Sequence, residues 1–299
     1  MSNFLGIDHP LIAVRDLDLA IARFSALGFT MAPKSRHPWG TSTCISIMQQ
    51  SLIEIVSIYD EALLDELPAG DFHFGRHVHH YLQEREGIAL TALYSDDAEN
   101  DAAKIAAQGI TCQGTIRFGR DVVLPDGTPD RTATTLKILY DADLPRLSNF
   151  ICQQHRPDLI YVPKWSNHAN GATSYAQLTI MAELADQPRV QARLTGLYGE
   201  QSLQSLADGF AVKTGNGWYV VTDRAGIEKR YGALPDALEQ ETQPACVALH
   251  IKVPDLNTVA ALLEKNDIRD SGSDKRLHLR NASLYGNVFV NFTIDEAPY

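Results

Sequence analysis

Several features that would assign a function directly are absent from this 299-residue sequence. No apolar run approaches the roughly 20 residues that a membrane-spanning helix needs. No GxSxG, P-loop or dinucleotide-binding glycine motif occurs in the chain. Basic residues form no concentrated stripe, and the formal net charge is −11. We therefore expect neither a membrane partner nor a nucleic-acid partner.

Cysteine is scarce and scattered. Cys44, Cys112, Cys152 and Cys246 are far apart in the sequence and form no CxxC pair. This spacing predicts reduced core thiols rather than a disulfide framework or a zinc ribbon. The first five residues also lack the basic and apolar regions of a signal peptide. A cytoplasmic location is the expectation from these observations.

The composition is that of a globular protein, with 44% hydrophobic and 21% charged residues. The opening stretch predicts a strand at residues 6–14 and then a helix that Asp16 or Asp18 caps and Gly28 ends. Two patterns follow the helix: a short strand at 29–32 and a turn-rich link at 35–40. A hairpin completes this unit, with strands 42–48 and 51–58 about Gln49-Gln50.

The corner between the first strand and its helix recurs along the chain. VRDL at 14–17 matches VPDL at 253–256, and YSD at 94–96 lies at the same kind of corner. Four βαβββ units are predicted in this way, with a helix at 74–85 between the first two. Such units pair to form curved sheets with a cup inside. We predict an α+β protein whose four modules form two cupped mixed β-sheet domains, at residues 1–156 and 157–299.

The sequence IDHPLIAVRDL at 7–17, followed by LGF at 27–29, resembles the entry to a vicinal oxygen chelate module. That superfamily includes glyoxalase I, extradiol dioxygenases, methylmalonyl-CoA epimerase and the bleomycin- and fosfomycin-resistance proteins. RHPWGT at 36–41, the strand around Glu54 and HANGA at 168–172 resemble more narrowly the glyoxalase-like proteins of bacteria. The resemblance is specific for the fold and says little about the reaction, because one fold hosts many chemistries.

The resemblance implies a metal position at His9, on the first strand, and Glu54, on the fourth strand. An octahedral metal site takes three or four protein ligands. In the second unit Ala89 matches His9, and the closing strand at 149–155 contains no carboxylate. We therefore expect either one divalent metal (Fe, Mn, Ni, Zn or Mg) or none. Without a metal, Glu54 is a buried carboxylate held by an arginine or by His9, or both side chains are polar anchors for an organic ligand.

The second paired-module domain is predicted to be degenerate. His250 lies two residues past Ala248, which is the position equivalent to His9. In the closing strand at 287–292, the only side chains that could bind a metal are the amides of two asparagines. Any activity is therefore expected in the first cup, with the second half as its support.

Further side chains of the first cup are candidates for chemistry and binding. Glu54 is a candidate general base, because burial in an apolar strand is expected to raise the pKa of its carboxyl group. His37, expected at the mouth of the cup, is the second catalytic candidate. The candidates for substrate binding are Arg36, Trp39, Arg117, Arg131 and Gln153, with Arg120 as another arginine able to clamp a carboxylate.

Three functions follow from these patterns. The first is a glyoxalase-like small-molecule enzyme of the lyase, isomerase or dioxygenase type, with a cup around His9 and Glu54. The second is a metal-free protein that binds a small molecule, as the resistance proteins of this fold do by resemblance. The third is a degenerate structural protein without a ligand. A small molecule is the expected partner in the first two, and a homodimer is left open.

Overall fold

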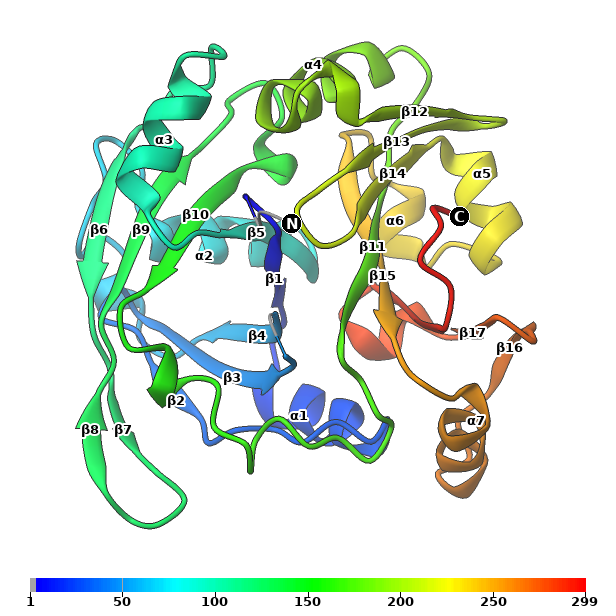
Figure 1. Ribbon diagram of the computed structural model, residues 1–299, viewed down its shortest axis with the longest axis horizontal. Helices are drawn as coiled ribbons and strands as arrows, with labels where there is room; N and C mark the ends of the chain where they lie inside the picture. The colour runs from blue at the N-terminus through cyan, green and yellow to red at the C-terminus, as the bar shows by residue number, and fades with distance from the viewer. Residues whose placement is uncertain (1–3, 50) are drawn as a thin grey trace.

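The computed structural model describes residues 4–49 and 51–299. Gln50, in the predicted turn of the first hairpin, lies outside the described residues, as does the start of the chain at residues 1–3. The strands form two eight-stranded mixed sheets and one separate two-stranded hairpin. Both large sheets are curled, and they lie side by side in the molecule (Figure 1).

The first sheet combines the first two βαβββ units. The first unit contains β1 (Ile7–Ala13), α1 (Leu17–Ala26), β2 (Ser35–Arg36), β3 (Thr41–Ile47) and β4 (Leu52–Ile58). The second contains β5 (Gly87–Tyr94), α3 (Ala98–Ala106), β6 (Gly114–Phe118), β9 (Thr134–Leu139) and β10 (Asn149–Gln154). The strand order is β2-β3-β4-β1-β5-β10-β9-β6. Because β1 and β5 pair antiparallel, the two units are joined at the middle of the sheet.

The second sheet repeats this arrangement with the last two units. The third unit contains β11 (Ser174–Met181), α4 (Gln187–Tyr198), β12 (Leu203–Leu206), β13 (Gly209–Lys213) and β14 (Trp218–Thr222). The fourth contains β15 (Ala245–Lys252), α7 (Leu256–Lys265), β16 (Asp270–Ser273), β17 (Arg276–Leu279) and β18 (Phe289–Thr293). The strand order is β12-β13-β14-β11-β15-β18-β17-β16, with β11 and β15 antiparallel at its middle. The predicted α+β fold of four modules in two cupped sheets is confirmed.

Insertions between these units add the remaining elements. The helix α2 (Phe74–Glu84) joins the first two units, and α5 (Arg224–Tyr231) and α6 (Asp236–Glu239) join the last two. An arm formed by β7 (Asp121–Val123) and β8 (Pro129–Arg131) lies between β6 and β9. This β7–β8 arm projects from the first sheet (Figure 1).

The recurring corner has a common physical cause. The carboxylate of Asp16 accepts a hydrogen bond from the backbone N–H of Leu19, at the start of α1. Asp97 and Asp255 cap α3 and α7 in the same way. Each aspartate satisfies an N–H group that the first helical turn leaves without a partner. The repeated Asp after a strand therefore marks the same boundary in three of the four units.

One predicted strand is wrong. Residues 29–32 are not in a strand, and β2 forms instead at Ser35–Arg36, inside the segment predicted as a turn-rich link. Pro33 interrupts the segment and has no N–H group for a ladder. Beyond it, Ser35 pairs with Thr43 of β3. The edge strand therefore starts later than the apolar pattern alone predicts.

Apolar residues cover both faces of each sheet. On the concave side of the first sheet, which we call the first cup, α2 packs on the strands through Phe74, Val78 and Tyr81. The second cup, on the concave side of the second sheet, is packed by α5 and α6. Buried residues of both halves, among them Ile12 and Leu249, belong to one continuous cluster between the sheets. The second half thus supports the strands that form the first cup.

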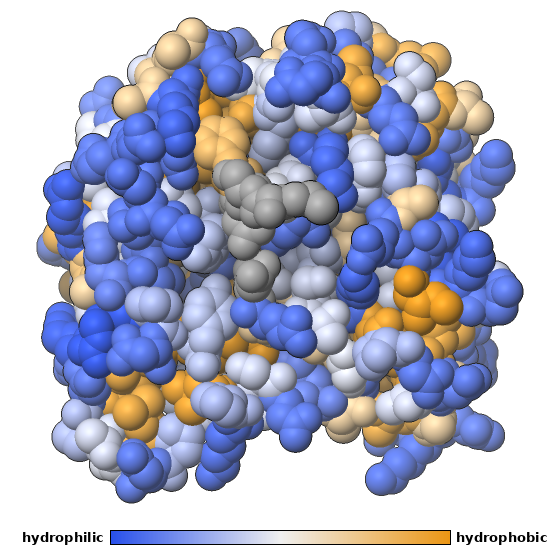
Figure 2. Space-filling model, in the orientation of Figure 1, coloured by the Kyte–Doolittle hydropathy of each residue, from blue (hydrophilic) through white to orange (hydrophobic). Residues whose placement is uncertain are grey.

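The outer surface is largely hydrophilic on the face shown in Figure 2, with separate apolar patches. None of the helices in the described parts of the chain is both long enough and apolar enough to cross a membrane.

Candidate active site

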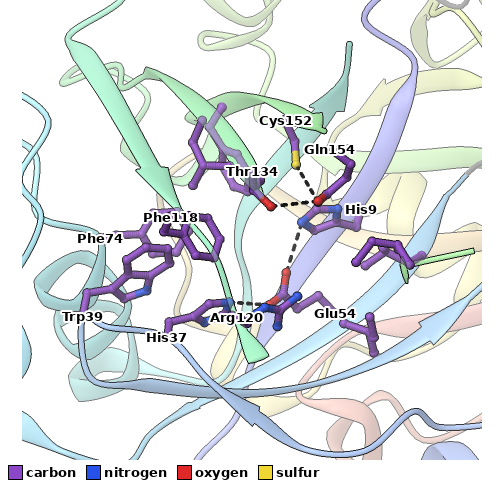
Figure 3. Close-up of a pocket in the computed structure, with 15 residues that line it drawn as sticks. His9, His37, Trp39, Glu54, Phe74, Phe118, Arg120, Thr134, Cys152 and Gln154 are labelled. Carbon is purple, nitrogen blue, oxygen red and sulfur yellow. Dashed lines mark hydrogen bonds and ion pairs between the residues drawn. The ribbon is translucent and has the colours of Figure 1, made fainter. Parts of the chain in front are cut away.

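His9 and Glu54 meet in the first cup. His9 is on β1 and Glu54 on β4, and these strands are parallel neighbours in which Leu11 pairs with Glu54. The His9 Nε2 atom lies 3.1 Å from Glu54 Oε2 (Figure 3). Both residues are buried, with exposed fractions of 4% and 8%. The two residues expected at the metal position of the fold therefore contact each other directly.

Their electrostatics are those of a buried ion pair. Burial by itself lowers the pKa of His9, but the carboxylates of Asp8 and Glu54 outweigh it and raise the pKa to about 9. Burial by itself raises the pKa of Glu54, but the hydrogen bond and charge of His9, with His37 and Arg120, lower it overall. The expectation of a raised pKa at Glu54 is therefore wrong, because an apolar strand does not remove a charged partner on the next strand. At neutral pH His9 is protonated and Glu54 is ionised.

The carboxylate of Glu54 has two more polar neighbours. Thr43 Oγ1 donates a hydrogen bond to Glu54 Oε1 at 2.7 Å. His37 Nε2 lies 3.8 Å from the same oxygen, beyond hydrogen-bond distance. Burial, followed by the charge of Arg120, lowers the pKa of His37 to about 3, so its imidazole is neutral. Its ring stacks on Trp39 with 4.7 Å between centroids.

Arg120 provides the positive charge at the edge of this group. Its guanidinium donates to Ser35 Oγ at 2.7 Å, and it lies close to Glu54 in Figure 3. Burial lowers the pKa of Arg120, although the charge of Glu54 opposes that shift. The backbone N–H of Arg120 donates to Thr132 Oγ1, which fixes the residue at the base of the β7–β8 arm.

These side chains border a small cavity, the inner chamber, of about 30 Å³. A cavity needs about 10–15 Å³ of this kind of volume for one water, so the chamber has room for very few. The remaining lining comes from aromatic and aliphatic residues and from the second unit. Its residues include Phe74, Phe118, Thr134, Phe150, Cys152 and Gln154.

The second unit does not complete a metal site. Leu11 pairs with Glu54 on β1 and β4, as Ala92 pairs with Phe150 on β5 and β10. Phe150 is therefore the equivalent of Glu54. His9 lies two residues before Leu11, and Leu90 lies two residues before Ala92. The equivalent of His9 is thus Leu90, and the prediction of Ala89 is wrong by one residue. Across residues 4–49 and 51–299, no group of three or more His, Cys, Asp and Glu side chains is arranged to hold a metal. The residues present do not fit the three or four ligands of an octahedral site.

The structure separates the predicted binding residues into two groups. His37 and Trp39 line the inner chamber together with His9 and Glu54. The other group consists of exposed arginines. Arg36 lies over the Tyr59 ring. Arg117 pairs with Glu99, and Arg131 pairs with Asp121. Gln153 bonds the backbone of Asp96 and Ala98, away from the chamber.

Sequence reasoning missed some of the chamber residues. Phe150, Cys152 and Gln154 line it, because alternate residues of β10 point to the same face of the sheet. The period-two pattern starting from Cys152 would have selected Gln154 instead of Gln153. Arg120 was recognised among three arginines of its region, but nothing in the sequence distinguishes it as the one that turns inward.

The second cup has a different polar group. Tyr231 Oη lies 2.8 Å from both Thr179 Oγ1 and His250 Nε2. Burial, followed by the charge of His278, lowers the pKa of His250, so this imidazole is neutral. The ring of Tyr299 stacks on His278, and the backbone of Tyr299 exchanges two hydrogen bonds with the Gln177 side chain. The cup is thus filled by residues of the chain itself.

Two curled sheets, each made from paired βαβββ units, define a protein of the vicinal oxygen chelate fold. The sequence from residue 7 to residue 198 matches the family model described as a glyoxalase-like domain. That match spans more than half of the chain, which therefore belongs to the glyoxalase-like domain family. No curated protein matches the sequence.

Similar solved structures support the fold along the whole chain. A hypothetical protein from Staphylococcus aureus superposes with a TM-score of 0.66 at 12% identity, covering 96% of this chain and 98% of that chain. A mutant 4-hydroxymandelate synthase from Streptomyces coelicolor gives 0.55 at 11% identity, covering 96% and 91%. A fusion of a xylose isomerase-like TIM barrel with 4-hydroxyphenylpyruvate dioxygenase gives 0.55 at 11%, covering 99% of this chain and 50% of that chain. At these identities the likeness concerns the fold alone.

Proposed function

We propose that this chain is a small-molecule enzyme of the isomerase or lyase type that moves a proton at the His9–Glu54 pair. The family and the fold favour a small-molecule enzyme or binding protein. The observation that carries the proposal is the buried ion pair, whose Nε2 and Oε2 atoms are 3.1 Å apart at the wall of the inner chamber. A buried acid and base in contact are the groups that general acid–base catalysis requires.

The pair has a proton donor and an acceptor ready for a carbonyl substrate. When a substrate oxygen takes the Nε2–H hydrogen bond of His9, Glu54 loses the partner that lowers its pKa. Its burial then raises the pKa of the carboxylate towards a useful general base. Glu54 removes a proton from the carbon next to the carbonyl, and His9 stabilises the enolate oxygen. Return of the proton to the opposite face of the same carbon inverts its configuration and completes an isomerisation.

Two other predicted site residues have parts in this proposal. His37 is a neutral imidazole with its Nε2 facing the same carboxylate, where it contacts the substrate oxygen. Trp39 is 1% exposed, and its Nε1–H has no hydrogen-bond partner within the described residues. Because an unpaired buried donor is unfavourable, a substrate acceptor that bonds it would gain affinity.

The dioxygenase type receives less support. Such chemistry requires a metal with open positions held by a facial set of ligands. His9 and Glu54 are two ligand types, and their equivalents Leu90 and Phe150 supply none. The protonated state of His9 further opposes coordination, because a metal must displace that proton.

The second candidate function is a metal-free binding protein. The specific observation in its favour is that His9 and Glu54 already satisfy each other, as they would in a site that only holds a ligand. The two functions differ in whether a proton is exchanged.

Deuterium exchange tests the proposal directly. 2-Oxohexanoate is incubated in D₂O with the protein, and loss of its C3 proton signal is followed by NMR. We expect the natural chain to exceed Glu54→Gln by about 100-fold or more, the usual contribution of a general base. Glu99→Gln, which changes an exposed carboxylate, is the matched control and should retain the rate.

Equal exchange rates for the natural chain and Glu54→Gln would contradict the enzyme proposal. If 2-oxohexanoate then still binds, with affinity reduced by His9→Asn, the binding-protein alternative replaces it.

A further inference from the structure

A second cavity, which we call the outer chamber, adjoins the inner chamber. It has a volume of about 250 Å³, compared with about 30 Å³ for the inner chamber. Ile45, Arg120 and Ile160 line both cavities and form the wall between them. The inner chamber is too small for a substrate of several carbon atoms, so the body of such a molecule must lie elsewhere.

The lining of the outer chamber is mainly apolar. Aliphatic side chains of β3 and of the β7–β8 arm line it, among them Ile47 and Val122, together with the ring of Trp165. Val123, on the same arm, is 62% exposed although it lines the chamber. An apolar patch lies on the surface where β2 and the β7–β8 arm are found (Figure 2). Exposed apolar groups of this kind commonly mark ligand-binding sites.

Positive charge is placed between the chambers. Arg120 lines both of them; its half-buried guanidinium donates a hydrogen bond to the neutral hydroxyl of Ser35 and lies near the Glu54 carboxylate. Lys34, at the rim, pairs with the exposed Asp18. Asp121, the acidic residue of the lining, pairs with Arg131. Because a guanidinium has five N–H donors and Arg120 uses one side-chain hydrogen bond, on Ser35, it keeps donors for an oxygen acid.

We propose that the outer chamber binds the apolar body of a medium-chain carboxylate, with the carboxylate at Arg120. The end of the acid that bears the carbonyl group then faces His9 and Glu54 across the wall that the two chambers share. The assignment of the reacting end rests on the proposed function, whereas the binding of the tail does not. The β7–β8 arm, an insertion in the second unit, is in this way the element that sets the preferred chain length.

Chain length is the variable that tests the outer chamber. Titration calorimetry measures the dissociation constants of acetate, butyrate, hexanoate and octanoate with the natural protein. Each methylene buried in an apolar site is expected to strengthen binding about fourfold. Octanoate, with four more methylenes, should therefore bind roughly 200-fold more tightly than butyrate, and octanol, which lacks the carboxylate, should bind at least about tenfold more weakly than octanoate.

Val122→Asp introduces a charge into the chamber wall and should weaken octanoate binding by at least about tenfold. Trp165→Ala is a second variant that removes an apolar wall without adding a charge, and it should weaken octanoate more than butyrate. Leu284→Asp is the matched control, since Leu284 is 39% exposed and lies outside both chambers. Affinity independent of chain length, or unchanged octanoate binding in both chamber variants, would overturn the proposal.

Glu54→Gln separates this inference from the proposed function. The variant should keep the chain-length dependence of binding, because Glu54 does not line the outer chamber, while loss of the negative charge near Arg120 changes the affinity for all four acids alike. Length-dependent binding without proton exchange means that the outer chamber is a ligand site and the enzyme proposal fails. Proton exchange with length-independent binding means that the enzyme proposal stands and the outer chamber has no such role.

Discussion

The two cups are built from the same βαβββ units but contain opposite kinds of polar group. In the first, His9 and Glu54 are oppositely charged neighbours beside a cavity. In the second, His250 is a neutral imidazole bonded to the Tyr231 hydroxyl, and Tyr299 fills the space next to it. Both sheets have the same strand order and the same antiparallel pair of strands at the middle. The fold alone therefore does not determine which cup contains groups able to exchange a proton. A few inward side chains make that difference.

The partner of each histidine determines its charge. His9 has the carboxylates of Asp8 and Glu54 nearby, which raise its pKa despite burial. For His250, burial and neighbouring groups that can carry positive charge, His278, Arg276 and Arg230, act in the same direction and lower the pKa. One buried imidazole is therefore an acid at neutral pH, and the other is a hydrogen-bonding core residue.

The largest expected difference between the cups is in the free energy of unfolding. His9→Leu leaves the Glu54 carboxylate buried without its cation and should reduce stability by about 3–5 kcal/mol. His250→Leu removes one neutral hydrogen bond and should reduce it by about 1–3 kcal/mol. Urea denaturation of both variants measures the difference.

The double variant His9→Leu/Glu54→Leu is the control for the charge effect. It removes both ions, and we expect it to recover most of the lost stability. Equal losses for His9→Leu and His250→Leu, with no recovery in the double variant, would show that the first cup contains no buried ion pair.

The next effect is a pH dependence of opposite sign in the two cups. The pKa of His9 is raised from 6.5 to about 9, so its stabilisation is complete below pH 6.5 and is lost as the pH rises through about 9. Relative to the His9→Leu/Glu54→Leu variant, the natural protein should lose roughly 1.5 kcal/mol of unfolding free energy between pH 6.5 and 8, below the pH range of the buried thiols. The variant keeps the contributions of the other buried histidines, so the difference between the two proteins isolates the His9–Glu54 pair.

In the second cup the sign is reversed. The pKa of His250 and that of His278 are lowered by burial, so the unfolded chain binds these protons first as the pH falls below 6.5. Stability from this cup therefore decreases toward acid pH, and His250→Leu should weaken that decrease. An equal pH dependence of the natural protein and the His9→Leu/Glu54→Leu variant between pH 6.5 and 8 would contradict the assignment at His9.

The smallest expected effect is that of divalent metals. Mn²⁺, Fe²⁺, Ni²⁺ and Zn²⁺ are titrated against the natural chain and against His9→Ala, with metal content measured after dialysis. Because the cup supplies two ligand types and His9 carries a proton, we expect no difference in content between the two proteins. About one equivalent in the natural chain, lost in both His9→Ala and Glu54→Gln, would restore the metalloenzyme interpretation.

The sequence predicted the framework and two central residues of the site. Asp16 and Asp255 of the recurring corner cap their helices, and Asp97, one residue after the YSD pattern, caps α3. His9 and Glu54 on neighbouring strands were expected in one cup. The prediction was wrong about which face of β10 each residue occupies, since Gln154 and not its neighbour Gln153 lines the chamber. It also could not separate Arg120 from Arg117 and Arg131, because all three lie in one hairpin region and their neighbours in the sequence do not show which of them turns inward.

The sequence by itself determined the alternation of strands and helices, because hydrophobic periodicity and capping aspartates act over a few residues. It also determined that the second unit lacks a carboxylate opposite Glu54. Only the tertiary structure decided that His9 is charged, that Glu54 has a lowered pKa, and that a second chamber lies behind Arg120. These properties depend on the distances and burial of groups distant in the sequence, which local patterns do not encode.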